Sequence, residues 1–297
     1  MRFSELMKNL EHEDLEFITK YGEIKEYQDE YFYTINSRNS DLMQEIKSKV
    51  SEEKPMFPYL SNGENFSKVK RPIKWDVLLS NKCEERSAKD LIGKFYDGNT
   101  GSKWPFLDKG HLVAREFQKY ICKRNKPIDN FFYKNVSSNI AYQFCDKNRG
   151  NGKKRGQHQF EQAVMNWFQK ANDTDSESKK VIVYYEVEPI FLNFDNKMSS
   201  LNPDDRIPIG TRIFAFRDTD TSDQVNNFIR QSKKKDEFKI TLPYHIFIPN
   251  YIEDYDAEKD LDISKIREKF EDFYAGDEQA KCSLSKWYSN QNTANTK

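Results

Sequence analysis

The chain has 297 residues, enough for one large domain with attachments or for two small domains. It is 32% charged and 14% aromatic, and no apolar run approaches the roughly 18 residues that span a bilayer, which argues against a helical membrane protein. The N-terminal segment turns acidic within a few residues and lacks the pattern of a secretory signal, so we expect a cytoplasmic protein. Four widely spaced cysteines, none in a CxxC pair, are expected to be free thiols and not zinc ligands.

The net charge is zero, but the charges are unevenly distributed along the chain. Residues 101–155 contain 13 Lys or Arg and 4 Asp or Glu, whereas residues 250–278 contain 4 basic and 11 acidic residues. A neutral total can therefore hide a basic working surface and an acidic appendage. A charged run is more often only a solvated surface. The basic segment is interpreted as a functional surface only because the candidate catalytic residues lie inside it.

The periodicity of apolar residues predicts an α+β protein with three parts. Residues 1–70 are expected to form a mostly helical accessory region, because apolar residues recur at helical spacing within 3–10 and 42–50. Residues 71–250 carry the expected strands and the candidate site, and residues 251–297 form an acidic tail with one expected helix over 263–274. In chain order the central part predicts a strand over 73–79, a short helix over 114–122, a strand over 135–144, a polar loop over 146–156, an amphipathic helix over 157–171, and strands over 181–188, 211–217 and 238–248.

The candidate chemistry begins with His111, in the sequence Asp108-Lys109-Gly110-His111. Hydrolysis of a phosphodiester needs a base to activate water, a cation on the phosphate and stabilisation of the leaving group. A neutral imidazole is a suitable base near pH 7. Asp108 is close enough in sequence to support it, and Gly110 allows a close approach of the backbone. A lone histidine is more often structural, so this motif alone leaves both interpretations open.

A second group of residues lies downstream at a defined spacing. Asn139-Ile140-Ala141-Tyr142-Gln143 is followed five residues later by Asn148, and Glu161 lies on the predicted helix. This arrangement resembles the DNA/RNA non-specific endonuclease family of the ββα-metal, or His-Me finger, nucleases, whose members carry D-R-G-H, N-x-x-P-Q, a later Asn and a Glu on a helix. The resemblance covers about residues 73–250. It implies a ββα-metal core with a central mixed or antiparallel sheet, to which the helical N-terminal extension and the acidic C-terminal tail are attached.

The resemblance also implies a role for each motif residue. His111 would be the general base and Asn148 the only direct protein ligand of one Mg²⁺, for which Mn²⁺ could substitute. A single amide ligand is sufficient because Mg²⁺ keeps most of its hydration shell. Asp108, Asn139, Gln143 and Glu161 would orient the hydrated metal or fix the hairpin from an outer layer, with Asn139 as scaffolding of the strand.

The sequence departs from the family pattern in three places. Lys109 replaces the usual Arg, which keeps the charge but loses the two-pronged contact to a phosphate. Tyr142 replaces the usual Pro. Glu161 lies 13 residues after Asn148, further than in the family, because residues 151–155 are inserted.

Basic residues surround the expected metal ligand. Lys147, Lys153, Lys154 and Arg155 are expected to bind the phosphate backbone of a nucleic acid, with an affinity that falls with salt. Arg115 and Arg149 are both candidates for stabilising the charge of the transition state, and the sequence does not choose between them.

These features favour an endonuclease that acts on DNA, RNA or both without strong sequence specificity, because its contacts would be directed at phosphates. Such an enzyme needs control in its own cell, so we hypothesise a toxin or defence effector held by an inhibitory protein partner. One alternative is a catalytically degenerate nucleic-acid-binding or scaffold protein on the same fold. Another is a site-specific HNH-type nuclease, for which His158 is the only candidate second metal-binding histidine, at a poor spacing.

Overall fold

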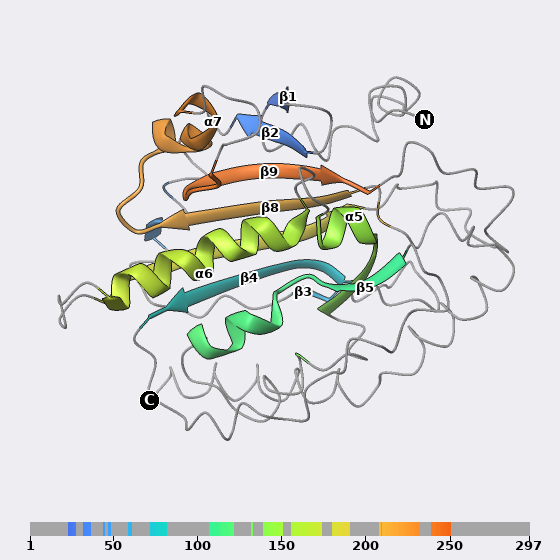
Figure 1. The fold of residues 1–297 in the computed structure, drawn as a ribbon, viewed down its shortest axis with the longest axis horizontal. Coiled ribbons are helices and arrows are strands. Elements are labelled where there is room, and N and C mark those ends of the chain that lie inside the picture. The colour runs from blue at the N-terminus through green and yellow to red at the C-terminus, as the bar shows by residue number, and fades with distance from the viewer. Residues whose placement is uncertain are drawn as a thin grey trace, which may run out of the picture.

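The computed structural model describes residues 23–27, 32–36, 44, 47–48, 59–60, 72–81, 107–121, 132, 139–150, 156–173, 180–190, 208, 210–231 and 239–250. Its centre is a seven-stranded sheet, crossed on one face by the long helix α6 (Gln157–Asp173) (Figure 1). The strand order is β1-β2-β9-β8-β7-β4-β3, and every pairing is antiparallel. The strands are β1 (Glu23–Tyr27), β2 (Phe32–Asn36), β3 (Tyr59–Leu60), β4 (Pro72–Ser80), β7 (Ile182–Ile190), β8 (Gly210–Arg217) and β9 (Tyr244–Pro249). Helix and antiparallel sheet together give the α+β class expected from the sequence.

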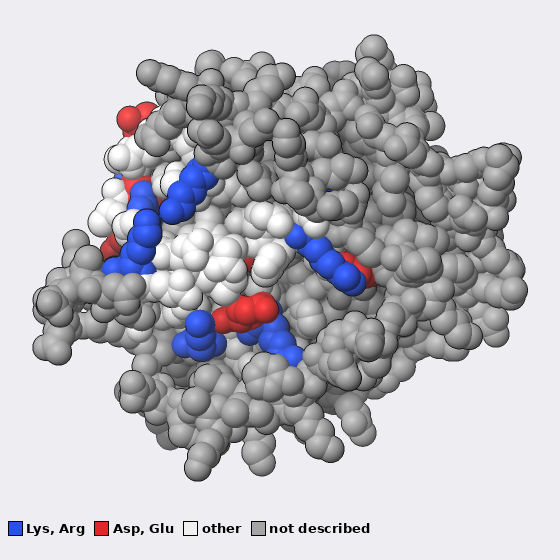
Figure 2. All heavy atoms as spheres, in the orientation of Figure 1, with Lys and Arg blue, Asp and Glu red and all other residues white. Residues whose placement is uncertain are grey.

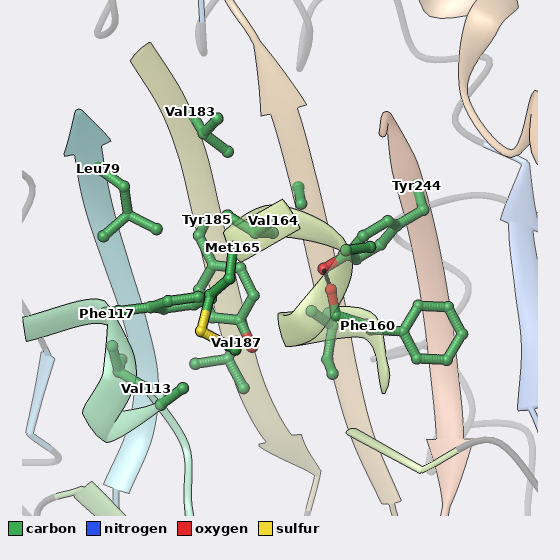
Figure 3. Packing of buried hydrophobic residues seen from close by; sticks show 14 of the residues in the cluster. Leu79, Val113, Phe117, Phe160, Val164, Met165, Val183, Tyr185, Val187 and Tyr244 are labelled. Atoms are coloured by element: carbon green, nitrogen blue, oxygen red, sulfur yellow. Dashed lines mark hydrogen bonds between the residues drawn. The ribbon is translucent and has the colours of Figure 1, made fainter. Parts of the chain in front are cut away.

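Helix α6 packs its apolar side onto the sheet (Figure 3). Phe160, Val164 and Phe168 recur at helical spacing and are fully buried. The ring of Phe160 meets the ring of Tyr244 edge-on at 5.2 Å, and the Tyr244 hydroxyl donates a hydrogen bond of 2.9 Å to the Phe160 carbonyl. These contacts fix the start of α6, where the candidate site lies, to strand β9.

The opposite face of the sheet is also buried and contains an ionic cluster around Arg212. Side chains alternate between the two faces of a strand, so Arg212 points away from its neighbour Ile213, which packs in the core under α6. The Arg212 guanidinium is 0% exposed, donates to Glu188 Oε2 at 2.7 Å and pairs with Glu186. Its Nη1 lies 3.0 Å from Nε2 of the buried His245. Arginine can only donate, so His245 accepts this bond in its neutral form, in keeping with the lowering of its pKa by burial.

The strands expected in the central part are confirmed as β4, β7, β8 and β9. The strand expected over 135–144 is described from Ile140, as β6 (Ile140–Phe144), and the helix expected over 114–122 is the 3-10 helix η2 (Arg115–Tyr120). The helix expected over 157–171 is α6. The sequence did not indicate α5 (Cys145–Asn148) within the expected loop, or η5 (Ser222–Gln224) and α7 (Asn227–Gln231) before β9.

The expectation of a mostly helical region over residues 1–70 is wrong for the strands β1, β2 and β3. Strand β2 pairs with β9, and Phe32 meets the ring of Phe160 edge-on at 5.1 Å, so this segment belongs to the main core. Strands of five residues are too short for their alternation to stand out against neighbouring helical periodicity. Residues 44, 47 and 48 are helical, as expected. The helices expected over 3–10 and 263–274, with the acidic tail, lie outside the described residues, and no described helix is long and apolar enough to cross a membrane.

Candidate active site

A separate two-stranded hairpin brings the motif residues together next to the start of α6 (Figure 1). Strand β5 (Leu107–His111) pairs with β6 in an antiparallel register that places Asp108 opposite Gln143 and His111 opposite Ile140. Helix α5 follows β6 directly and ends at Asn148. The two halves of the sequence motif therefore meet in one strand–strand–helix unit.

Asp108 fixes the orientation of the Asn148 amide. The buried Asp108 carboxylate accepts a hydrogen bond of 2.9 Å from Asn148 Nδ2 on its Oδ2 atom. The same carboxylate accepts Arg149 Nε at 2.6 Å and pairs with the Arg149 Nη2 group, although the Arg149 side chain is 67% exposed. A carboxylate only accepts hydrogen bonds, so it selects the amino end of the Asn148 side chain and turns Oδ1 away from itself.

Gly110 leaves room for two amide oxygens. A Cβ atom on Gly110 would lie 2.8 Å from Gln143 Oε1 and 3.1 Å from Asn148 Oδ1, so a larger residue would displace one or both. The amino group of Gln143 is held by Gln157 Oε1 at 2.8 Å and by Thr211 Oγ1 at 3.2 Å. Within the described part of the chain the Oε1 atom of Gln143 is buried and has no hydrogen-bond partner. Two oriented amide oxygens therefore lie close together against Gly110.

The donor chemistry at this place fits a hard divalent cation that keeps much of its water. Amide and carboxylate oxygens are the ligands of Mg²⁺, and Mg²⁺ is commonly held by only one or two side chains. The described residues contain no group of three or more His, Cys, Asp or Glu side chains that could hold a metal ion. A dedicated protein cage is therefore absent from the described ranges, and Asn148 Oδ1, with Gln143 Oε1 beside it, is the set that could serve.

The surroundings of His111 select one tautomer of its ring and favour the neutral form. Its Nε2 atom lies 3.2 Å from the carbonyl oxygen of Phe132. A carbonyl can only accept, so Nε2 carries the proton and Nδ1 keeps its lone pair. Burial lowers the pKa of His111 below its usual value of 6.5, against the raising effects of the Phe132 carbonyl and of Glu116, and Arg115 lowers it further. The imidazole is therefore neutral at pH 7.

Asn139 supports the backbone that follows His111. Its side-chain Oδ1 accepts the Val113 N–H at 2.8 Å, its Nδ2 donates to the Val113 carbonyl at 3.1 Å, and its own carbonyl accepts Leu112 N–H at 2.9 Å. Both ends of the fully buried amide are thus engaged with this segment. The Asn139 amide thus binds the backbone of the segment after His111 and is not turned toward Asn148.

Glu161 is buried behind the site, in a state that the sequence did not predict. Its Oε1 accepts Gln157 Nε2 at 2.8 Å, and the Tyr185 hydroxyl lies at 3.5 Å. Burial raises the pKa of Glu161 to about 8, against the lowering effect of the Gln157 hydrogen bond. Glu161 is therefore mostly protonated at neutral pH, which differs from the carboxylate expected to orient a hydrated metal. Gln157 connects Glu161 to Gln143, and its place on the apolar side of α6 was the only signal for it in the sequence.

The expected basic residues are only partly described. Lys147 is 9% exposed, so it lies within the fold and not at the tip of a loop, a correction to its expected role in binding a nucleic-acid backbone. Arg115 is the first residue of η2, which follows the strand that ends at His111. His158 is exposed at the start of α6. On the face that carries α6, described basic side chains are scattered around an uncharged stretch (Figure 2). The side chains of Lys109 and Tyr142, and the residues Lys153, Lys154 and Arg155, lie outside the description.

Among the solved structures that are similar to this chain are two of NucA from Streptococcus agalactiae. The structure with no metal bound is 15% identical, covers 84% of this chain and 89% of its own, and has a TM-score of 0.48. The structure with a magnesium ion bound is 15% identical, covers 82% of this chain and 93% of its own, and has a TM-score of 0.45. No family model and no curated protein matches this chain. The function proposed for this chain rests on its own residues and their geometry.

Proposed function

We propose that this protein is a Mg²⁺-dependent endonuclease that hydrolyses phosphodiester bonds of DNA, RNA or both without strong sequence specificity. The observation that carries the proposal is the orientation of Asn148. Its Oδ1 faces the space above Gly110 because Asp108 binds its Nδ2 at 2.9 Å, and the next residue along β5 is the neutral His111. The expected base and an oriented oxygen ligand thus belong to the same strand–strand–helix unit.

His111 would supply the proton transfer. Its Nδ1 lone pair accepts a proton from water, the water oxygen forms a bond to phosphorus, and the bond from phosphorus to the leaving oxygen breaks. Bound Mg²⁺ would neutralise charge on the phosphate and on the leaving oxygen. The Phe132 carbonyl holds the opposite nitrogen at 3.2 Å and stabilises the imidazolium that forms.

Two arginines border the site and could meet the charge that develops on the phosphate. Arg149 is held by Asp108 while most of its side chain is exposed, and Arg115 is close enough to His111 to affect its pKa. Both guanidinium groups suit the planar, two-pronged recognition of phosphate oxygens. Basic residues of the inserted loop, namely Lys153, Lys154 and Arg155, would add contacts to the backbone of the substrate.

Contacts directed at phosphates carry no base specificity, so both DNA and RNA fit the proposal as substrates. We also propose that an inhibitory protein partner binds the enzyme and blocks its activity, as for a toxin or defence effector. A cytoplasmic location would make that control necessary.

Two observations favour a second candidate, a degenerate nucleic-acid-binding protein. Asp108 is already ion-paired with Arg149, and Glu161 is buried with its pKa raised to about 8. Neither carboxyl group would then offer an unpaired negative charge to a bound metal ion. The binding protein would keep salt-sensitive affinity for nucleic acid and lack cleavage.

The test is to incubate the purified protein with supercoiled plasmid and with total RNA, in Mg²⁺, in Mn²⁺ and in EDTA. The proposal expects nicked and then linear plasmid, with fragments of many lengths, only when a divalent cation is present. Binding that weakens with salt, without cleavage under any metal, would favour the second candidate.

A further inference from the structure

Gln157, the first residue of α6, contacts several parts of the candidate site through the two ends of its side-chain amide. It is 1% exposed. Its Nε2 atom lies 2.8 Å from the His111 carbonyl oxygen, 2.9 Å from the Leu112 carbonyl oxygen and 2.8 Å from Glu161 Oε1. Its Oε1 atom accepts Gln143 Nε2 at 2.8 Å. One side chain thus contacts both strands of the hairpin.

The two ends of the Gln157 amide hold two different residues of the site, His111 and Gln143. The donor end of Gln157 holds the peptide carbonyls at the end of β5, which sets the position of His111. The acceptor end takes the amino group of Gln143 and so keeps Gln143 Oε1 turned toward Gly110 and Asn148 Oδ1. If the Gln157 amide were reversed or lost, the hydrogen bonds that hold the His111 backbone and orient the Gln143 amide would be lost.

We infer that Gln157 is a positioning residue for the proposed nuclease reaction, coupling the place of His111 to the orientation of Gln143. The inference rests on the proposed function, and Gln157 itself touches neither reacting atom. Neutral, two-ended amide chemistry is what the position requires, because it must donate to two carbonyl oxygens and accept from an amide at the same time. Glu161 Oε1 lies 2.8 Å from the same amide nitrogen, so the carboxyl group is a further acceptor in this network.

The test compares Gln157→Leu and Gln157→Glu with a matched control, Gln162→Leu. Gln162 is on the same helix, and its amide donates to Asn166 Oδ1 at 3.0 Å, away from the hairpin. Gln157→Leu removes both ends of the amide, and Gln157→Glu keeps the accepting oxygen and the length. For each protein we would measure kcat, KM and the Mg²⁺ concentration for half activation on a DNA duplex, and the pKa of His111 by NMR.

We expect both Gln157 variants to lose about 10- to 100-fold in kcat, the usual effect of an outer partner of a metal site, with KM within about twofold of wild type. The pKa of His111 should move in both variants and stay unchanged in Gln162→Leu. A Gln157→Leu protein that folds and keeps the wild-type kcat and His111 pKa would overturn the inference. Failure of both variants to fold would also overturn it, since Gln157 would then serve stability. An inactive wild type would refute the proposed function, while the His111 pKa would still decide the role of Gln157.

Discussion

Asp108 Oδ2 accepts a hydrogen bond of 2.9 Å from Asn148 Nδ2, and this bond joins the first strand of the hairpin to the end of α5. The two residues are 40 positions apart in sequence. An asparagine amide can present either end to a ligand, and a carboxylate on one side settles which end remains. The proposed cation ligand therefore depends on Asp108 as much as on Asn148.

Asp108→Ala should raise the Mg²⁺ concentration for half activation by about 10- to 100-fold, because the Asn148 amide loses the acceptor that orients it. A Mg²⁺ titration of duplex cleavage measures this. Arg149→Met is the matched control, since it removes the ion pair and keeps the Asp108 acceptor; its Mg²⁺ requirement should change less. An unchanged requirement in Asp108→Ala would show that Asp108 does not set the ligand.

Activity should persist to lower pH than an ordinary histidine allows. Burial lowers the pKa of His111 below 6.5, so the neutral base is populated down to that lower pKa and is lost only below it. The acid limb of kcat/KM against pH, measured at saturating Mg²⁺, should have its midpoint below 6.5. His158→Ala, which changes an exposed histidine on α6, should leave the profile in place. A midpoint at or above 6.5 would contradict the described environment of His111.

Glu161 should make the folded state less stable as pH rises. Its pKa is about 8 in the folded protein and close to 4.5 when exposed, so between these values the unfolded chain releases a proton that the folded chain keeps. The contribution of Glu161 to the free energy of unfolding therefore falls from about pH 4.5 to about pH 8. In thermal melts, Glu161→Gln should gain in Tm over wild type as pH is raised through this range. A difference in Tm that stays constant with pH would argue that Glu161 is ionised in the fold.

Arg212→Met should destabilise the fold strongly, by about 3 to 5 kcal/mol, because Glu186 and Glu188 would be left buried without their main cation. Urea unfolding followed by circular dichroism measures the loss. Arg217→Met is the control: the Arg217 side chain is 18% exposed and pairs with one carboxylate, Asp220, which keeps the Arg217 backbone N–H at 2.8 Å, so its removal should cost less. Equal losses in the two variants would mean that Arg212 is not the centre of the cluster.

Much of the central architecture follows from local patterns in the sequence. The strong periodicity of α6 and the β-branched runs of β7, β8 and β9 identify these elements because burial on a sheet or under a helix repeats with a fixed spacing. The spacing from Gln143 to Asn148 singles out both residues in the sequence, although the helix α5 that carries Asn148 was expected to be a loop. The pairing of β2 with β9 is a contact between distant segments, and short strands carry too little signal to predict it.

The chemistry of individual site residues was harder to predict. A sequence shows that Glu161 is a carboxylic acid, but its protonation depends on burial among groups from other elements, including Tyr185 on β7. The same holds for Gln157, whose four partners come from β5, β6, the segment after His111 and α6 itself. Lys147 shows the converse case, a residue expected at a charged surface that the fold buries.

The most direct measurement of the proposed nuclease chemistry is single-turnover cleavage of a labelled DNA duplex by wild type, His111→Ala and Asn148→Ala, with Mg²⁺ and with EDTA. We predict cleavage by wild type only with the metal, and a loss of at least about 100-fold in each variant, the lower range for removal of a general base. His158→Ala should cleave like wild type. Unchanged cleavage by folded His111→Ala, or wild-type cleavage in EDTA, would contradict the assignment of base and metal ligand.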